Sequence, residues 1–405
     1  MKKKYLITGL CMQGNKGGPA IALALTSAIS EHFPSTEFVF SVPAKGFDLE
    51  KVWAQKYGYE VVENIDLKHL IPPLMFFGGR LGRLLRWVKT LKGTDAMIQM
   101  SAISYVGPPS ANPKLRTLLS GRFMDFYMSK LLNRPMYAWT QSYGPLTTKL
   151  IRFLAKCDLK AQPVIFCRGD DCLAEVQKLL PEKPMLSYPD IAVTLEYDSK
   201  WAIDYLEKNN FPTSGFVSLS PSAVIYSKSH TDDGRNEHIE MLKKVCEDLI
   251  SKKIKVVLVP HTYRPGNHNP NVCDYGTSKE LLKHIKNKNG VYLIDDDLSA
   301  TELKSIISLA HVHIGGRYHS VVASLSSGVP TLSLSWHPKY KDVMRVYGLE
   351  DFVMVNYNES SWFLLNNLLM NREKFSTRIL QAHQVVIKQS RENVAKFSAL
   401  IKDEQ

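Results

Sequence analysis

The chain lacks the long apolar runs of a membrane-spanning protein, and it has few cysteines. No stretch reaches the roughly 18 to 20 consecutive apolar residues that a transmembrane helix requires. The basic start leads into a short apolar run without a small-residue cleavage site, so we expect a first strand there. The 6 cysteines include no CxxC pair and are too sparse for a disulfide framework. These absences favour a reducing, cytoplasmic location.

The sequence also lacks the ligand spacing of a metal centre and the signature of a nucleic-acid-binding module. His311 and His313 lie two residues apart in a strand-like run, and no metal-ligand constellation appears around them. No RNA- or DNA-binding motif accompanies the positive charge of the chain. We therefore expect no metal, no other cofactor and no nucleic-acid partner.

What is present is a globular composition with an excess of positive charge. The 405 residues are 44% hydrophobic and 22% charged, and a chain of this length usually divides into two domains. The formal net charge of +12 by itself suits nucleic acid, an anionic substrate or an anionic membrane surface. Composition alone does not choose between these partners.

Part of this charge lies in residues 80–92, RLGRLLRWVKTLK, which are predicted to form an amphipathic helix. One face carries Leu81, Leu84, Leu85, Val88 and Leu91, and the cations around the other are Arg80, Arg83, Arg86, Lys89 and Lys92. Because the apolar segment LIPPLMFFGG precedes it, the helix is suited to peripheral association with an anionic membrane. The alternative is a domain helix whose leucines face the core and whose cations are solvated.

Strand-like and helix-like segments alternate along both halves of the chain, which predicts parallel sheets with crossover helices. The expected strands lie near residues 5–10, 37–42, 94–100, 136–142, 163–168, 216–222, 252–262, 291–297, 311–317 and 331–336. We predict an α/β fold of two doubly wound, Rossmann-like domains facing a cleft, over residues 1–195 and 196–370. A C-terminal helix over residues 371–405 is expected to pack back across them. Ligands of such folds bind at the carboxyl ends of the strands.

Residues 315–330, GGRYHSVVASLSSGVP, form the most informative segment. After a strand-like run, two glycines bring Arg317 and His319 to the start of a predicted helix. Backbone N–H groups and the helix dipole favour an anion there, and Arg317 adds a forked, permanently charged donor. The alternative is that Gly315 and Gly316 only make a tight turn and Arg317 caps a surface.

Other polar residues follow expected strands in both halves. Arg168 comes directly after PVIFC, where it binds a ligand or merely pairs with Asp170 or Asp171. The strand MYAWTQS ends in Gln141 and Ser142, which also suit an ordinary turn. In the second half, the strand VVLVP ends at His261, and the long loop after it leads to Asp274. A loop of this length between α/β elements is more often functional than not.

Several of these segments, taken in order, resemble the polysaccharide pyruvyl transferases. The matching segments are GNKGGPAIAL, TQSYGPL, CRGDDCLAEVQKL, PDIAV, VPHTY and GGRYHSVVASLSSGVP, which parallel family patterns such as G-N-x-G-D, Q-S-x-G-P, P-H-x-Y and G-x-R-x-H. The chain departs from the family at Gly18, where the usual Asp is absent, and at Cys172, which replaces a usual Ser. These changes suggest a divergent branch with its own acceptor.

The resemblance implies a two-domain fold of the glycosyltransferase type called GT-B, with phosphoenolpyruvate as donor. By position in the motifs, Arg168 and Arg317 are implied as ligands of the donor anions and His319 as the acid. Gly316 and Tyr318 lie in the same donor-binding segment of the C-terminal domain, and the N-terminal domain would serve the acceptor. Further candidates on the acceptor side or in secondary roles are Asn15, Gln141, Ser142, His261, Asp274 and Lys339.

The chemistry is compatible with these roles. Phosphoenolpyruvate carries a phosphate and a carboxylate, so its site needs cationic donors held at a fixed separation. Ketal formation begins with protonation of the methylene carbon, and a histidine such as His319 titrates near neutral pH. Asp190, Asp274 and His261 stay open as bases. The expected acceptor is a sugar of a cell-surface polysaccharide or of its lipid-linked oligosaccharide precursor.

Two other functions stay open. A GT-B-type glycosyltransferase would place the diphosphate of a nucleotide sugar at residues 316–319 and usually shows an acidic residue for the ribose. The segment after Gly328 contains no clear Glu at that point, although Asp342 could serve. The second alternative is a non-catalytic scaffold that binds membranes or anionic polymers, which the joint presence of Arg168, Arg317 and His319 disfavours.

Overall fold

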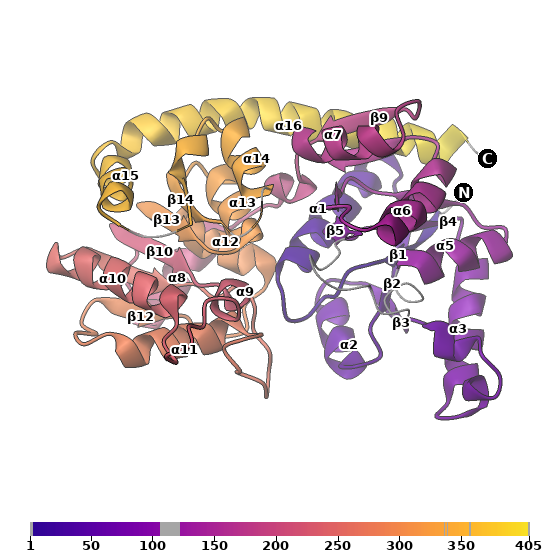
Figure 1. Cartoon of the computed structure of the whole chain (residues 1–405), viewed down its shortest axis with the longest axis horizontal. Helices are drawn as coiled ribbons and strands as arrows, with labels where there is room; N and C mark the ends of the chain where they lie inside the picture. The colour runs from indigo at the N-terminus through magenta and orange to yellow at the C-terminus, as the bar shows by residue number, and fades with distance from the viewer. Residues whose placement is uncertain (1–2, 106–121, 336, 338, 356–357, 404–405) are drawn as a thin grey trace. The chain divides into compact units, whose positions relative to one another are not determined.

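The computed structural model describes residues 3–105, 122–335, 337, 339–355 and 358–403. They form two compact units, each built around its own parallel sheet (Figure 1). The first unit comprises Met1–Gln13, Ile21–Ile191 and Gln389–Gln405, and the second comprises Gly14–Ala20 and Ala192–Lys388. The sequence predicts a boundary after residue 195 and does not indicate that Gly14–Ala20 belongs with the second unit.

The first unit contains a five-stranded parallel sheet with the order β3-β2-β1-β4-β6. Its strands are β1 (Lys4–Thr8), β2 (Glu37–Val42), β3 (Glu60–Glu63), β4 (Ala96–Gln99) and β6 (Met136–Ala138). The helices of this part of the chain are α1 (Gly17–His32), α2 (Phe47–Lys56), α3 (Arg80–Lys92), α5 (Arg122–Leu131), α6 (Lys149–Ala161) and α7 (Asp170–Leu179), with the short turns η1 (Leu67–His69) and η2 (Leu74–Phe76). Strands β1 and β2 bury nearly every side chain, as continuous apolar strands of helix-covered parallel sheets do.

Two smaller sheets complete the first unit. Strands β5 (Ile103–Ser104) and β7 (Ser142–Tyr143) pair with each other, and so do β8 (Ile165–Arg168) and β9 (Met185–Tyr188). The strand that ends in Arg168 therefore lies outside the five-stranded sheet. A single bridge between Gln141 and Cys167 connects β8 to the segment that follows β6.

The second unit contains a six-stranded parallel sheet with the order β12-β11-β10-β13-β14-β15. Its strands are β10 (Phe216–Ser220), β11 (Lys255–Leu258), β12 (Val291–Leu293), β13 (Val312–Gly315), β14 (Thr331–Leu334) and β15 (Val353–Met354). The helices are α8 (Ser199–Lys208), α9 (Ala223–Tyr226), α10 (Glu237–Ser251), α11 (Asp274–His284), α12 (Ala300–Ser308), α13 (Tyr318–Ser326), α14 (Lys339–Val346) and α15 (Glu359–Met370), with the turns η3 (Ile191–Thr194) and η4 (Glu350–Phe352). The strands expected from the sequence are present in both units, and Trp336, at the end of the last expected strand, lies outside the described residues.

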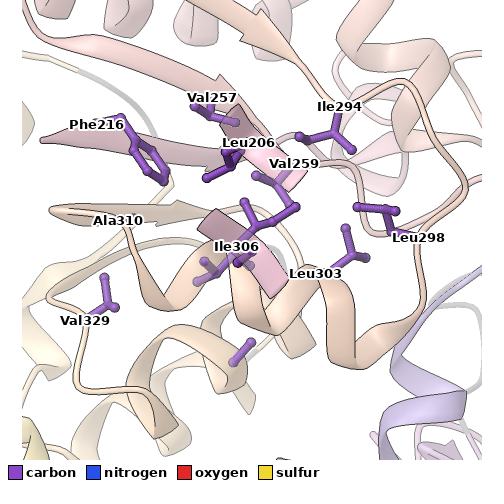
Figure 2. Packing of buried hydrophobic residues seen from close by; sticks show 13 residues of the cluster. Leu206, Phe216, Val257, Val259, Ile294, Leu298, Leu303, Ile306, Ala310 and Val329 are labelled. Carbon is purple, nitrogen blue, oxygen red and sulfur yellow. The ribbon is translucent and has the colours of Figure 1, made fainter. Parts of the chain in front are cut away.

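The core of the second unit packs helices α8 and α12 against the sheet. Leu206, Val259 and Ile306 lie together in the middle of this buried cluster (Figure 2). Since β10, β11 and β13 are adjacent and parallel, their carboxyl ends fall at the same edge of the sheet. This edge presents the segments that begin at Ser220, Val259 and Gly315.

The C-terminal helix α16 (Arg372–Asp403), yellow in Figure 1, contributes to both units. In the second unit, His383 contacts the Tyr347 hydroxyl through Nδ1 at 3.0 Å. In the first unit, the ring of Phe397 packs edge-on against Trp139 with the centroids 4.9 Å apart, and Asn393 hydrogen-bonds Thr140. The terminal helix expected from the sequence is therefore present, and it packs against side chains of each unit.

The basic segment 80–92 is a helix, α3, and part of its apolar face belongs to the core. Leu84, Trp87 and Leu91 are buried with side chains of β1, β2 and β4, and the Trp87 indole donates to Ser41 Oγ at 2.9 Å. Leu85, which the sequence assigned to the apolar face, is instead 60% exposed. The prediction of this face was therefore wrong in two residues, since Trp87 belongs to it and Leu85 does not.

Candidate functional site

Gly315 and Gly316 allow the turn after β13 to approach its neighbours closely. A Cβ atom on Gly316 would lie 2.8 Å from the carbonyl oxygen of Ser220 at the end of β10, and one on Gly315 would lie 2.5 Å from Val321 Cγ2. The Gly316 N–H donates to the same Ser220 carbonyl at 2.8 Å. These glycines are needed for space, and they fix the start of α13 against the carboxyl edge of the sheet.

Arg317 immediately precedes α13 and is held by a buried carboxylate. Its Nε donates to both carboxylate oxygens of Asp274 at 2.9 and 2.8 Å, and its Nη2 donates to Oδ1 at 2.6 Å. Asp274 is fully buried and also accepts from the Ala223 N–H at 2.8 Å. Burial disfavours the charged guanidinium, but the Asp274 carboxylate outweighs it and raises the pKa of Arg317. Arg317 is therefore locked in one orientation and stays cationic. Because its side chain is only 13% exposed, it does not cap a surface, whereas its role in donor binding stays a prediction.

His319 lies in the first turn of α13, with its ring against the backbone of Gly17. A side chain at position 17 would overlap the imidazole of His319. The neighbouring Tyr318 packs edge-on against this ring, with the centroids 5.2 Å apart. Lys339 Nζ lies 4.9 Å from the centroid of the Tyr318 ring, so the first turn of α14 brings another cation to the start of α13.

The glycine loop Gly14–Ala20 is part of the same region. The Lys16 N–H donates to the His261 carbonyl at 2.9 Å, and Asn15 forms an antiparallel bridge with Thr262. The exposed Asn15 accepts the Gly17 N–H through Oδ1 at 3.1 Å. The loop therefore runs alongside the segment after β11, and its Gly17 contacts the ring of His319.

Lys16 is a buried residue that the sequence patterns did not indicate. Its side chain is 2% exposed, and its Nζ lies 2.5 Å from Asp297 Oδ1. Lys16, His261, Lys304 and His319 line one small cavity together with apolar side chains of α12 and α13. The only signal in the sequence is the position of Lys16 inside the glycine loop, since Asp297 and Lys304 are remote along the chain.

Burial keeps His261 neutral. It lowers the pKa of His261 to about 4, although the nearby Asp274 carboxylate acts in the opposite direction. The Nδ1 atom lies 3.4 Å from Ser220 Oγ. A neutral imidazole is therefore present beside Lys16 and the start of α13.

The candidates of the first unit form a separate hydrogen-bonded group. Arg168, 5% exposed at the end of β8, donates Nη1 to Asp190 Oδ2 at 2.5 Å and Nε to Ser142 Oγ at 3.1 Å. Its Nη2 donates to the Ala102 carbonyl. These contacts join the loops after β4 and β9 to strand β7, and the partner Asp190 is one that the sequence did not suggest for this arginine.

Gln141 and Cys172 support the same group. Gln141 is fully buried, accepts from Ser104 Oγ at 2.6 Å and donates to Gln99 Oε1 at 2.9 Å. Cys172 Sγ accepts the Tyr143 N–H at 3.1 Å, and hydrogen bonding from the adjacent Cys167 lowers the pKa of the Cys172 thiol. The structure thus gives Gln141 and Cys172 internal partners, whereas the acceptor role of Gln141 stays a prediction.

The two histidines around β13 are engaged with the protein itself. His313 contacts Ser218 Oγ through Nδ1 at 2.8 Å and Ser320 Oγ through Nε2 at 3.0 Å, while His311 Nε2 lies 3.2 Å from the Leu369 carbonyl. Among the described residues, no group of three or more His, Cys, Asp or Glu side chains could hold a metal ion. Nor does any helix in the described part of the chain combine the length and apolarity needed to cross a bilayer.

Two Rossmann-like units define a GT-B-like fold, and one of them brings Arg317, His319 and Lys339 to the start of a helix. The chain belongs to the polysaccharide pyruvyl transferase family, because the sequence model of that family matches residues 15–338. This match confirms the resemblance seen in the motifs and supports a transferase that modifies polysaccharide. No curated protein matches the sequence significantly.

Solved structures share this fold at low sequence identity. MnaA of S. aureus, solved with UDP, has a TM-score of 0.59 at 13% identity, with 94% of this chain and 91% of that chain covered. A ugt transferase from Siraitia grosvenorii in complex with UDP has a TM-score of 0.58 at 11% identity, with 99% and 100% covered. UDP-GlcNAc 2-epimerase from Neisseria meningitidis, bound to UDP-GlcNAc, has a TM-score of 0.56 at 11% identity, with 100% of both chains covered. These likenesses confirm the expected GT-B-like fold and carry no evidence on the substrate.

Proposed function

We propose that this protein transfers a pyruvyl group from phosphoenolpyruvate to sugar hydroxyls of a cell-surface polysaccharide or its lipid-linked precursor, forming a pyruvate ketal. The observation that carries the proposal is the pairing of Arg317 with Asp274 at the start of α13, two residues before His319. Asp274 fixes the orientation of Arg317, and His319, the proposed proton donor, lies in the first turn of the same helix. The reaction is proposed to take place in the cytoplasm, at the inner face of the membrane that carries the precursor.

Donor binding is assigned to the start of α13. Asp274 occupies Nε and Nη2 of Arg317, and Nη1 makes no hydrogen bond to the residues that the structure describes. Nη1 and the N-terminal end of α13 suit one anionic group of phosphoenolpyruvate, and Lys339 suits the other. The contacts of Arg168 to Ser142, Asp190 and Ala102 favour a structural role, and its direct contact with the donor stays a prediction.

The proposed reaction starts with transfer of a proton from His319 to the methylene carbon, which becomes a methyl group. A sugar hydroxyl then bonds to the adjacent carbon and loses its proton, and the phosphate leaves with the electrons of its C–O bond. A second hydroxyl bonds to the same carbon to complete the ketal, and its proton restores His319. Asp274 and Asp190 each accept hydrogen bonds from an arginine, so we assign the neutral His261 as the base for the first hydroxyl. His261 passes this proton to the leaving phosphate and returns to its neutral state.

The test is calorimetric and thermal-shift titration of the purified protein with phosphoenolpyruvate, UDP-sugars and GDP-sugars. Replacing Arg317 alone would leave the buried Asp274 charge uncompensated, so the informative variant is Arg317→Met combined with Asp274→Asn. The matched control is Arg235→Met with Asp233→Asn, which removes an exposed arginine–aspartate pair from the same unit.

Stabilisation of the wild type and the control by phosphoenolpyruvate, lost in the Arg317 variant, would support the proposed donor. Ketal formation would then be checked by mass spectrometry of candidate glycan acceptors. Stabilisation only by a nucleotide sugar would assign the protein to glycosyl transfer, and Asp342, which contacts Arg345 at 3.2 Å, would become the residue to test for ribose binding. No stabilisation by any donor would favour the scaffold alternative.

A further inference from the structure

The turn before α3 exposes apolar side chains on the first unit. Phe76 and Phe77 are 66% and 62% exposed, and Ile71 and Leu74 are 38% and 41% exposed. Leu85, on the face of α3 away from the core, is 60% exposed. In Figure 1 the turn lies at the outer margin of this unit. We call these five residues the apolar tip.

Contacts from α3 hold this turn in place. Arg80 Nη1 donates to the Leu74 carbonyl and Arg83 Nη2 donates to the Gly78 carbonyl, both at 2.9 Å. Gly78 and Gly79 adopt positive φ values of 60° and 69°, which a glycine adopts without strain. On the opposite side, α3 is anchored to the core by Trp87 and Leu91. These contacts therefore hold the apolar tip in a defined conformation.

The charge around the apolar tip is positive. Residues 67–94 contain the cations Lys68, Arg80, Arg83, Arg86, Lys89 and Lys92 and no Asp or Glu. Glu63 of β3 lies 3.7 Å from Arg83 and 3.3 Å from Arg86, and Asp66, directly before this segment, contacts His69 at 2.9 Å. Lys89 and Lys92 are exposed. Exposed aromatic and aliphatic side chains beside a cationic helix are the combination with which peripheral proteins bind the headgroup region of anionic bilayers.

We propose that the apolar tip inserts into an anionic lipid leaflet while the cations of α3 contact its headgroups. Charge complementarity favours this partner over a second copy of the chain, whose identical cations would repel. A soluble polyanion would pair with the cations but leave Phe76, Phe77 and Leu85 in water. The inference rests on the proposed function only for the purpose of membrane binding, which is to bring the enzyme to a lipid-linked acceptor. Membrane binding itself is measured without any donor or acceptor.

The experiment is flotation of the full-length protein with vesicles of phosphatidylcholine alone and of phosphatidylcholine mixed with phosphatidylglycerol. The wild type should float with the mixed vesicles only, and added salt should weaken binding. Phe76→Ser with Phe77→Ser should reduce partitioning by at least about tenfold, and so should Lys89→Glu with Lys92→Glu. The matched control is Phe363→Ser on α15, where a phenylalanine is 70% exposed in a segment, residues 358–371, that contains no Lys or Arg.

Because all substituted side chains are exposed, the variants should keep the melting temperature of the wild type. Absence of wild-type binding to the mixed vesicles would overturn the proposal, as would equal binding by the double phenylalanine variant. Loss of self-association in that variant, measured by light scattering without lipid, would identify the apolar tip as an interface between copies. Salt-sensitive binding of heparin with no vesicle binding would assign the cations to a soluble polyanion. None of these results depends on phosphoenolpyruvate, so failure here and failure of the proposed function are distinguishable.

Discussion

Arg317 and Asp274 form a buried, forked ion pair that orients the arginine before any ligand arrives. The carboxylate accepts from Nε and Nη2 at 2.6 to 2.9 Å and also accepts the Ala223 N–H at the start of α9. Asp274 therefore joins the loop after β11 to the turns after β10 and β13. A cation held in this way loses little conformational freedom when it binds an anion.

The first prediction concerns this carboxylate. Asp274→Asn keeps the shape of the side chain but removes the charge that compensates Arg317, so the free energy of unfolding should fall by about 3 to 5 kcal/mol. Urea denaturation measures the change. Asp233→Asn, which breaks the exposed pair with Arg235, is the control and should leave the unfolding midpoint unchanged. Equally small effects in both variants would contradict the structural role of Asp274.

The second prediction separates binding from proton transfer. His319→Gln removes the proposed acid but keeps a polar side chain of similar reach, so donor affinity should persist while turnover falls by about 10² to 10⁴. Isothermal titration and a phosphate-release assay measure the two quantities. His230→Gln, at an exposed histidine of the same unit, should change neither. A parallel loss of affinity and turnover would reassign His319 to donor binding.

The third prediction uses the contact between Gly17 and His319. Gly17→Ala suits the helical backbone of α1, but its methyl group would occupy the position of the His319 ring. The imidazole must move, so turnover should drop by at least about tenfold with little change in helix content, because a misplacement of about 1 Å is costly in catalysis. Gly82→Ala is the control, since its Cβ would meet only Arg86 at 3.6 Å. Unchanged turnover in Gly17→Ala would remove His319 from the reaction.

The fourth prediction concerns pH. Burial lowers the pKa of His238 and His313 to about 3 and that of His261 to about 4, all below the unfolded value of 6.5. Between pH 6.5 and these values the unfolded chain binds more protons, so the free energy of unfolding should fall as pH falls, by up to about 1.4 kcal/mol per pH unit for each histidine. Urea titrations at pH 7, 6 and 5 measure this slope.

His238→Gln tests the assignment for one of these residues. The dependence of the unfolding free energy on pH should lose the contribution of one proton, because the Gln amide does not titrate. The amide oxygen can still accept the hydrogen bond that the Ser222 N–H now donates to His238 Nε2. Gln at the exposed His230 should leave the slope as it is. An unchanged slope in His238→Gln would show that His238 is not held neutral by burial.

Much of the fold was predictable because its signals are local. Continuous apolar segments predicted the strands, and the glycines before Arg317 and His319 predicted a helix start after β13. The face of α3 was less predictable: Trp87 is buried and Leu85 is exposed, since the face that meets the core depends on where neighbouring strands lie. Arg317 and His319 do lie together, as the sequence predicted. Lys16 was missed because the sequence pattern of a lysine in a glycine loop predicts a solvent-exposed side chain.

The sequence by itself determined the two α/β units, the family and the helix start that carries Arg317 and His319. Helical and strand periods, glycine spacing and motif order are properties of neighbouring residues. Only the tertiary structure decided which carboxylate holds each cation: Asp274, 43 positions from Arg317; Asp190, 22 positions from Arg168; and Asp297 for Lys16. The reason is physical: parallel strands joined by crossover helices bring remote loops to one edge of a sheet, and burial there demands a partner for every charge.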